Sequence, residues 1–395
     1  MTGAPPRRAL VIAPQPFFSP RGTPFSVYYR TLVTAEQGIE IDLLTYGAGE
    51  DVAIDGVRIV RIPRLRWLGE IKVGPSPLKA FLDVFLIAWT LGLLLRRRYD
   101  FVHAHEEAIF YCFLLKPIFR FKLIYDMHSS LPQQLTNFSF TKSRLLIGAF
   151  ERLERASLKA ANAVITICPD LADYALDLID DPDKHALIEN SIFEDVRLAN
   201  PPRAGANGAR VALPEGRPMV AYAGTLEPYQ GIDLLLNAFS MARREVPDAF
   251  LLVVGGAPAQ VARYRDLAAG LDLTEHVLFT GRLPQAQARA LVAGAAAQVS
   301  PRVRGTNTPL KVYEQLANGI PLIATDIYSH RQVLDDKVAF MTAPEPEPFA
   351  RGIIAALGDD AARAARVAAA RRLYDEKYGR GAYVAKLRRI LARVA

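Results

Sequence analysis

The sequence is poor in cysteine. Only Cys112 and Cys168 occur among its 395 residues, and neither has a second Cys or a His at metal-ligand spacing. This excludes a disulfide framework and argues against a structural zinc site, and it indicates a reducing compartment such as the cytoplasm. The amino terminus has only a short apolar run before prolines interrupt it, too little for a signal peptide.

The sequence also lacks an apolar run long enough to cross a bilayer, which takes roughly 20 residues. The longest, Ala80–Leu95, has about 16 residues and contains Asp83, and it predicts a largely buried helix. The second, Ile109–Ile124, is broken by Pro117 and mixes aromatic with basic residues, which is typical of a face on a membrane interface. A buried helix followed by a buried strand is the alternative.

Basic residues outnumber acidic ones, 48 to 41, giving a net charge of +7. This favours an anionic partner: nucleic acid, a membrane surface or a phosphorylated substrate. The basic excess lies between Arg58 and Lys159, the stretch that also holds the apolar segments. No motif for nucleic-acid binding occurs, so we expect no nucleic-acid partner.

Short apolar runs alternate with helix-like stretches, which predicts parallel sheets covered by helices. The expected strands are Ala9–Ala13, Glu40–Thr45, Val57–Arg61, Phe101–Ala104, Lys122–Asp126 and Ala163–Ile167, then Met219–Ala223, Ala249–Val254, Val277–Thr280, Ala297–Ser300 and Pro321–Ala324. The stretch Asn200–Pro218 is rich in Pro, Gly and Ala and indicates an exposed connection.

We therefore expect an α/β protein of two Rossmann-like, doubly wound domains facing across a cleft. They span residues 1–204 and 205–375, and a helix over 376–395 crosses back to the first. Such sheets bind ligands at the carboxyl ends of their strands, so the chemistry should lie in the loops there.

In the first half, Gly22 permits a tight turn after the first strand, and the helix that starts near Thr23 presents free N–H groups to an anion; an ordinary turn is the alternative. His103 and His105 share one face of a strand, but no Cys and no H-x-x-x-H helix completes a metal set. His128 follows the next strand as a hydrogen-bonding or proton-handling group, or else as a satisfied structural histidine.

The second half has a denser set of loops. A loop with a glycine near each end, Gly224 and Gly231, follows its first strand, and another strand ends in the turn Gly281-Arg282-Leu283, whose backbone suits the edge of a base. In the densest loop Thr308 is expected to cap a helix with Pro309 first and Leu310 next. A phosphate fits there, beside Lys311 and Arg302 or Arg304, unless the helix start is merely solvated. The other loop residues expected at this site are Thr225, Gln230, Thr306 and Asn307, and Glu314 a turn later can accept hydrogen bonds from sugar hydroxyls.

These residues resemble the retaining glycosyltransferases of family 4, which have the GT-B fold. The strongest match, Glu314–Ala324, is similar to the segment that ends the family's E-x7-E motif. The resemblance implies that Glu314 holds the ribose of a sugar nucleotide and that Gly22 approaches the diphosphate. It further implies that His128 contacts the transferred sugar and that the turn at Gly281 meets the base.

Three positions depart from the family pattern. Thr306 stands where the first glutamate of E-x7-E is expected, and Thr225 and Gln230 stand where most members have an Arg and a Lys that clamp the diphosphate. We expect Lys311, with Arg302 or Arg304, to supply the missing charge.

The resemblance implies transfer of a sugar from a nucleotide diphosphate sugar, commonly a UDP-sugar, to a hydroxyl, with retention. His128, Lys311 and Glu314 are the candidate catalytic residues. No obligatory metal or cofactor is expected, because a helix amino terminus and basic side chains can stabilise the departing diphosphate. The basic, apolar first domain predicts a lipid or lipid-linked glycan acceptor, met at the inner face of the cell membrane.

Two other functions stay open. A sugar-nucleotide epimerase would need acid and base carboxylates, for which Glu106, Glu107 and Asp126 are candidates. A non-catalytic membrane-surface binding protein is compatible with the three departures from the family pattern.

Overall fold

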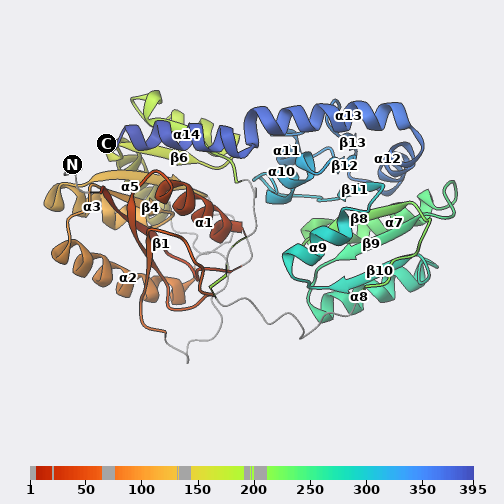
Figure 1. The fold of residues 1–395 in the computed structure, drawn as a ribbon, viewed down its shortest axis with the longest axis horizontal. Coiled ribbons are helices and arrows are strands. Elements are labelled where there is room, and N and C mark those ends of the chain that lie inside the picture. The colour runs from red at the N-terminus through yellow and green to blue at the C-terminus, as the bar shows by residue number, and fades with distance from the viewer. Residues whose placement is uncertain are drawn as a thin grey trace. The chain divides into compact units, whose positions relative to one another are not determined.

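A computed structural model describes residues 6–19, 22–64, 76–130, 132, 144–190, 196, 198–199 and 211–395. The chain divides into two compact units (Figure 1). The first comprises Met1–Asn190, Val196–Pro202 and Tyr383–Ala395, and the second comprises Ser191–Asp195 and Arg203–Ala382. The expected boundary at residue 205 and half of the expected connection lie outside the described residues. The chain rejoins the first unit at Tyr383, within helix α14 (Arg380–Ala392).

The first unit is built on a seven-stranded parallel sheet with the order β3-β2-β1-β4-β5-β6-β7. Its strands are β1 (Arg8–Ala13), β2 (Glu40–Thr45), β3 (Val57–Arg61), β4 (Phe101–His105), β5 (Lys122–Met127), β6 (Ala163–Thr166) and β7 (His185–Leu187). Its other helices are α1 (Gly22–Ala35), α2 (Pro77–Arg96), α3 (Ala108–Phe119), α5 (Arg144–Ala160) and α6 (Pro169–Leu176). The inner strands β1, β4 and β5 are buried along almost their whole length because both faces of a parallel sheet are covered.

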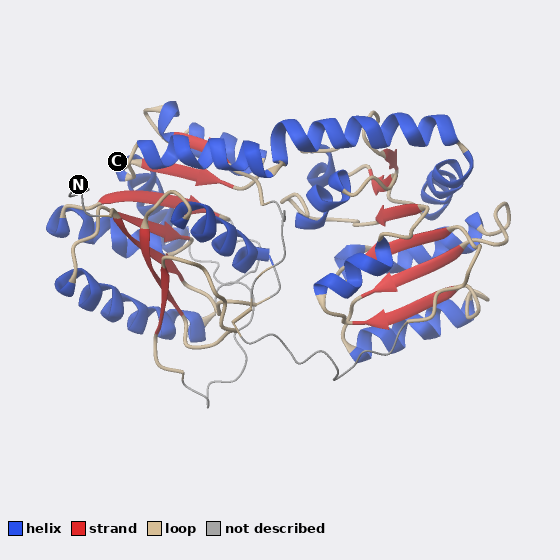
Figure 2. Cartoon of the chain, viewed as in Figure 1, coloured by secondary structure: helices blue, strands red, loops and turns tan. Residues whose placement is uncertain are grey.

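The second unit repeats the plan with a six-stranded parallel sheet of order β10-β9-β8-β11-β12-β13 (Figure 2). Its strands are β8 (Met219–Ala223), β9 (Phe250–Val254), β10 (Val277–Gly281), β11 (Ala297–Ser300), β12 (Leu322–Thr325) and β13 (Phe340–Thr342). Its helices are α7 (Ile232–Ala242), α8 (Pro258–Gly270), α9 (Gln285–Val292), α10 (Leu310–Ala317), α11 (Tyr328–Arg331), α12 (Pro346–Gly358) and α13 (Asp360–Leu373).

In both sheets the strand order reverses beside the first strand. β1 lies between β2 and β4, and β8 lies between β9 and β11. The loops that leave such a switch point diverge to opposite faces of the sheet and open a crevice at the carboxyl ends of the strands. Among the candidate residues, Gly224, Thr225 and Gln230 lie in the segment after β8, and Arg302, Arg304, Thr306 and Asn307 lie in the loop after β11.

Two expectations about the apolar segments are wrong. Helix α2 is not largely buried: 28% of its most apolar 18-residue stretch is buried, and Val84 and Leu95 are exposed. Only one stripe of it, which includes Leu82 and Leu86, packs on the sheet. At 20 residues it is also long and apolar enough to cross a membrane by length and composition. Pro117 does not break the second segment, because α3 continues through it to Phe119.

Candidate functional site

The loops at the carboxyl edge of the second sheet contact one another through glycines. The Gly224 N–H donates to the Val254 carbonyl over 2.9 Å, and the Gly255 N–H donates to the Gly281 carbonyl over 2.8 Å. A Cβ atom at Gly255 would lie 2.0 Å from the Gly224 oxygen, and one at Gly231 would lie 1.9 Å from the Pro301 oxygen. Both glycines have positive φ angles, 119° and 73°, so residues with side chains do not fit.

Lys311 is the cation on which these loops converge. Its Nζ atom lies 3.3 Å from Oε1 of Gln230 and 4.2 Å from the centroid of the Tyr222 ring. A Cβ atom at Gly224 would lie 3.6 Å from the same Nζ. Burial, helped by the nearby charge of Arg302, lowers the pKa of Lys311 to about 7. An anionic ligand beside it would favour its protonated form.

Arg302 is held beside Lys311. Its guanidinium lies 5.2 Å from the centroid of the Tyr229 ring, and its Nε donates to the Arg304 carbonyl over 2.8 Å. Its Nη1 donates to the Asn307 carbonyl over 3.3 Å. Burial lowers the pKa of Arg302, whereas Arg304 is exposed. The structure therefore brings Arg302 and Lys311 together with Gly224 and Gln230. That they bind a phosphate stays a prediction.

The expected start of the helix after this loop is wrong by one residue. Helix α10 begins at Leu310, with Pro309 as its cap residue and no capping hydrogen bond from a side chain. The Thr308 hydroxyl is buried, with no hydrogen-bond partner among the described residues. Proline at the cap itself leaves Thr308 outside the first turn, too far from its N–H groups to cap them. Thr306, two residues before Thr308, is exposed, and its carbonyl accepts a hydrogen bond from Gln332.

Glu314 stands one turn into α10 and forms an ion pair with Arg289 of α9. Both side chains are about one third exposed, at 32% and 31%. Sequence analysis missed Arg289, because nothing in the local pattern of α9 distinguishes it from a surface arginine. In the turn after β10, Arg282 is exposed and Leu283 packs against the core beside β9.

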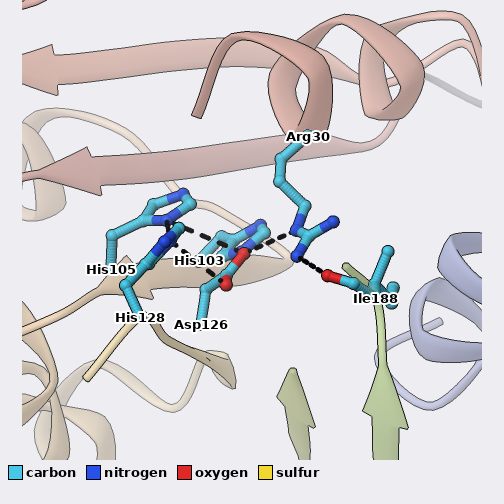
Figure 3. A network of polar contacts seen from close by, with 6 residues as sticks. All are labelled: Arg30, His103, His105, Asp126, His128 and Ile188. Atoms are coloured by element: carbon cyan, nitrogen blue, oxygen red, sulfur yellow. Dashed lines mark hydrogen bonds and ion pairs between the residues drawn. The ribbon is translucent and has the colours of Figure 1, made fainter. Parts of the chain in front are cut away.

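In the first unit, His128 belongs to a buried network formed by residues of β4 and β5, by His128 just after β5 and by Arg30 (Figure 3). Its Nε2 lies 3.1 Å from Nδ1 of His105 and 3.3 Å from Oδ1 of Asp126. The Asp126 Oδ2 accepts hydrogen bonds from Nε2 of His103 at 3.1 Å and from Nε of Arg30 at 2.8 Å. Sequence analysis missed Arg30, which lies within helix α1. Gly22 and Thr23 are the first two residues of that helix.

Among the described residues, neither a Cys nor an H-x-x-x-H helix completes a metal set around His103 and His105, but the fold adds Asp126 as a third possible ligand. Ligand atoms of these two residues and Asp126 lie within 4.8 Å of one another. Asp126 comes from the neighbouring strand, a contact that spacing in the sequence does not reveal. Its carboxylate is already paired with the guanidinium of Arg30, and a second cation there would meet that positive charge.

Burial alone would raise the pKa of Asp126, but the charge of Arg30, helped by the neighbouring histidines and the hydrogen bond from His103, outweighs it and holds the pKa well below its ordinary value. Burial lowers the pKa of His128 to about 4. At neutral pH the network therefore contains an arginine cation, a carboxylate anion and a neutral His128.

Of the carboxylates proposed for an epimerase, Asp126 belongs to this network, and Glu106 and Glu107 directly follow β4. The Glu107 carboxylate pairs with Nζ of Lys79 at 2.8 Å. Burial, together with the charge of Glu107, raises the pKa of Glu106 to about 7. The Asp126 carboxylate forms a buried ion pair with Arg30.

Two protein-family models match the chain. Residues 31–191 match the model described as "Glycosyl transferase 4-like domain", and residues 206–373 match "Glycosyl transferases group 1". Together they account for most of both units.

Similar proteins carry names of mannosyl- and glycosyltransferases. A GDP-mannose-dependent alpha-(1-6)-phosphatidylinositol monomannoside mannosyltransferase of Mycolicibacterium smegmatis is 37% identical over 27% of this chain and 30% of its own length. A phosphatidyl-myo-inositol mannosyltransferase of Mycobacterium tuberculosis is 30% identical over 36% of this chain and 38% of its own length. A D-inositol 3-phosphate glycosyltransferase of Corynebacterium glutamicum is 26% identical over 76% and 75%. The match thus spans well under half the length of the first two.

Solved structures share the fold. Sucrose-phosphate synthase from Thermosynechococcus elongatus has a TM-score of 0.74 and 19% identity, covering 98% of this chain and 99% of that one. WaaG, a glycosyltransferase of lipopolysaccharide biosynthesis, has a TM-score of 0.65 and 15% identity, covering 96% and 98%. At these identities the likeness concerns the fold alone, two Rossmann-like units of the GT-B type.

Proposed function

The chain belongs to the group 1 glycosyl transferases of family 4, and from that membership we propose that it transfers a sugar from a nucleotide diphosphate sugar to a hydroxyl group of a lipid or lipid-linked glycan. The observation that carries the proposal is that the positively charged side chains of Lys311 and Arg302 lie close together where the loops after β8 and β11 meet. Two cations at the carboxyl edge of a doubly wound sheet suit a diphosphate.

The family resemblance implies transfer with retention at the anomeric carbon. The bond between the anomeric carbon and the diphosphate oxygen breaks, the acceptor oxygen bonds to the same face of that carbon, and the acceptor's proton leaves with the diphosphate. The side chains of Lys311 and Arg302 stabilise the negative charge that develops on the diphosphate. Glu314 binds the ribose hydroxyls, and His128 contacts the transferred sugar. No metal ion is required, so EDTA leaves the rate unchanged.

We propose an inositol-containing lipid as the acceptor. Three similar proteins are named for inositol-containing acceptors, and the first unit carries apolar side chains on its surface. Leu95 on α2 and Leu114 and Ile118 on α3 are 76%, 60% and 70% exposed. Exposed cations flank them: Arg96, Arg98, Arg120 and Lys122. Such a surface suits an anionic membrane, here the inner face of the cell membrane.

The donor nucleotide is the open choice within this proposal. The family resemblance favours UDP, whereas one similar protein is named for GDP-mannose. A ligand held only by the folded state raises the unfolding midpoint, so a thermal-shift screen against UDP, GDP, ADP and NAD identifies the base.

The deciding assay then supplies the sugar nucleotide of the selected base. Radiolabelled sugar should enter the lipid fraction of vesicles that contain phosphatidylinositol and should not enter vesicles of phosphatidylcholine alone. Ready transfer to soluble inositol phosphate, with no response to vesicles, would overturn the lipid acceptor. Nucleotide-sugar turnover without any acceptor would favour an epimerase instead.

A further inference from the structure

Arg30 is a charged residue with no exposed side-chain surface. Its Nε donates to Oδ2 of Asp126 over 2.8 Å, and its Nη2 donates to the carbonyl of Ile188 over 2.7 Å (Figure 3). A buried ion pair gives little net stability, because removing two charges from water costs about as much as their attraction returns. The pair therefore calls for an explanation other than stability.

Asp126 connects Arg30 to the histidines, because its carboxylate contacts both. Its Oδ2 also accepts a hydrogen bond from His103, and its Oδ1 lies 3.3 Å from Nε2 of His128. That same Nε2 lies 3.1 Å from Nδ1 of His105. His128 thus hydrogen-bonds with His105 through Nε2, and the Asp126 Oδ1 beside it, which has no hydrogen-bond partner among the described residues, limits where the ring can lie. The Nδ1 of His128 is buried and has no hydrogen-bond partner among the described residues.

The carboxyl-terminal segment covers the other side of Arg30. The guanidinium carbon lies 5.1 Å from the centroid of the Tyr383 ring, and Tyr383 is itself buried. One turn further along α14, Lys386 forms an ion pair of 2.7 Å with Glu189, the residue after Ile188. Helix α14 and the segment after β7 therefore enclose the guanidinium within the first unit.

We propose that Arg30 and Tyr383 are positioning residues for His128. They hold the Asp126 carboxylate in one place, so that His128 keeps a single ring orientation and leaves Nδ1 for a hydroxyl group of the transferred sugar. The sugar's place at His128 rests on the proposed function, whereas the control of His128 by Arg30 and Tyr383 does not. Tyr383 lies 255 residues from His128 in the chain, so this assigns the carboxyl-terminal segment a role in the site.

The first test observes His128 without any ligand. The protein has six histidines, and ¹⁵N-labelled histidine resonances, assigned with His128→Gln, report the tautomer and pKa of each. The charged and titratable groups acting on His128 are Asp126, Arg30 and His103, with His105 in contact. Because the guanidinium disfavours a second positive charge, Arg30→Met should raise the pKa of His128 above about 4, and Arg30→Lys should restore the lower value.

Arg30→Met leaves Asp126 buried without its partner and can unfold the protein. Tyr383→Leu keeps the ion pair intact and so provides the second variant. It should broaden or double the His128 resonances, because the ring samples more than one orientation. Arg388→Met is the matched control: this exposed arginine lies on the same helix and donates to Gln37 instead. Wild-type His128 resonances in Tyr383→Leu would overturn the proposal.

The second test uses turnover. In Tyr383→Leu, kcat should fall about tenfold while KM for the sugar nucleotide stays within about twofold, and Arg388→Met should match the wild type. Equal changes in kcat and KM, or the same loss in both variants, would point to a structural role and overturn the proposal. If the wild type transfers no sugar, the proposed function fails, and the resonances of His128 alone decide this inference.

Discussion

The ammonium group of Lys311 lies 3.3 Å from Oε1 of Gln230. A cation from α10 thus donates a hydrogen bond to a side chain from the loop after β8. In most members of the family, by the resemblance described above, the position of Gln230 carries a basic residue. The nearby cation here comes instead from α10, and it belongs to a group whose pKa burial lowers to about 7.

Affinity for the donor should therefore depend on pH. Lys311 is charged below pH 7 and largely neutral above it, so the dissociation constant for a nucleotide sugar should rise by up to about tenfold per pH unit above pH 7. Neither Tyr222 nor His330 titrates there, because burial raises the pKa of the first and lowers that of the second to about 4. Calorimetry from pH 6 to pH 9 measures this.

The control for this dependence is Lys311→Arg, because a guanidinium stays protonated throughout the range. This variant should bind with little change from pH 6 to pH 9, whether more or less tightly than the wild type. An intact nucleotide sugar is the right probe, because its phosphates have no proton to lose near neutrality. A flat wild-type profile would remove Lys311 from the phosphate site.

Glu314 should separate ligand binding from stability. Its ion pair with Arg289 is one third exposed, so Glu314→Ala should change the free energy of unfolding by no more than about 1 kcal/mol. The rise in unfolding midpoint produced by the preferred nucleoside diphosphate should vanish in the variant, since the ribose loses its acceptor. Arg351→Ala, which breaks the exposed pair with Glu347 on α12, is the control and should keep the full shift.

Gly255→Ala should disrupt the loop contacts of the second unit. The added methyl would lie 2.0 Å from the Gly224 oxygen at a φ of 119°, so we expect a loss of about 2 kcal/mol or more and loss of nucleotide binding. Gly270→Ala, at the end of α8, adds the same group where no atom lies within 4 Å. Urea unfolding of the pair checks this, and equal stability would contradict the close approach.

The architecture was predictable from the sequence where strands are buried on both faces. Runs such as Ala9–Ala13 are continuous apolar segments, and the observed strands match them to within a residue or two. The two edge strands that were missed, β7 and β13, have three residues each and carry no such pattern. Helix α2 was misjudged because it is apolar around its circumference, and composition does not tell which side the sheet covers.

The candidate site was predictable only in part, for a related reason. Loops after strands and a helix amino terminus are local features, so Gly224, Arg302 and Lys311 could be assigned to one place. Arg30 and Arg289 gain their roles from partners 96 and 25 residues away. The local sequence pattern does not predict such contacts, because they arise from the packing of elements that are distant in the chain.

The exposed apolar residues of α3 should control membrane binding. Leu114 and Ile118 lie one turn apart and are 60% and 70% exposed, so Leu114→Ser/Ile118→Ser should leave the unfolding midpoint nearly unchanged. Each side chain buried in the interface contributes up to about 1.5–3 kcal/mol, so sedimentation with vesicles of phosphatidylinositol and phosphatidylcholine should fall by at least tenfold. Tyr328→Ser, at the 59% exposed Tyr328 of the second unit, is the control and should sediment like the wild type. Equal sedimentation of all three proteins would place the membrane contact elsewhere on the chain.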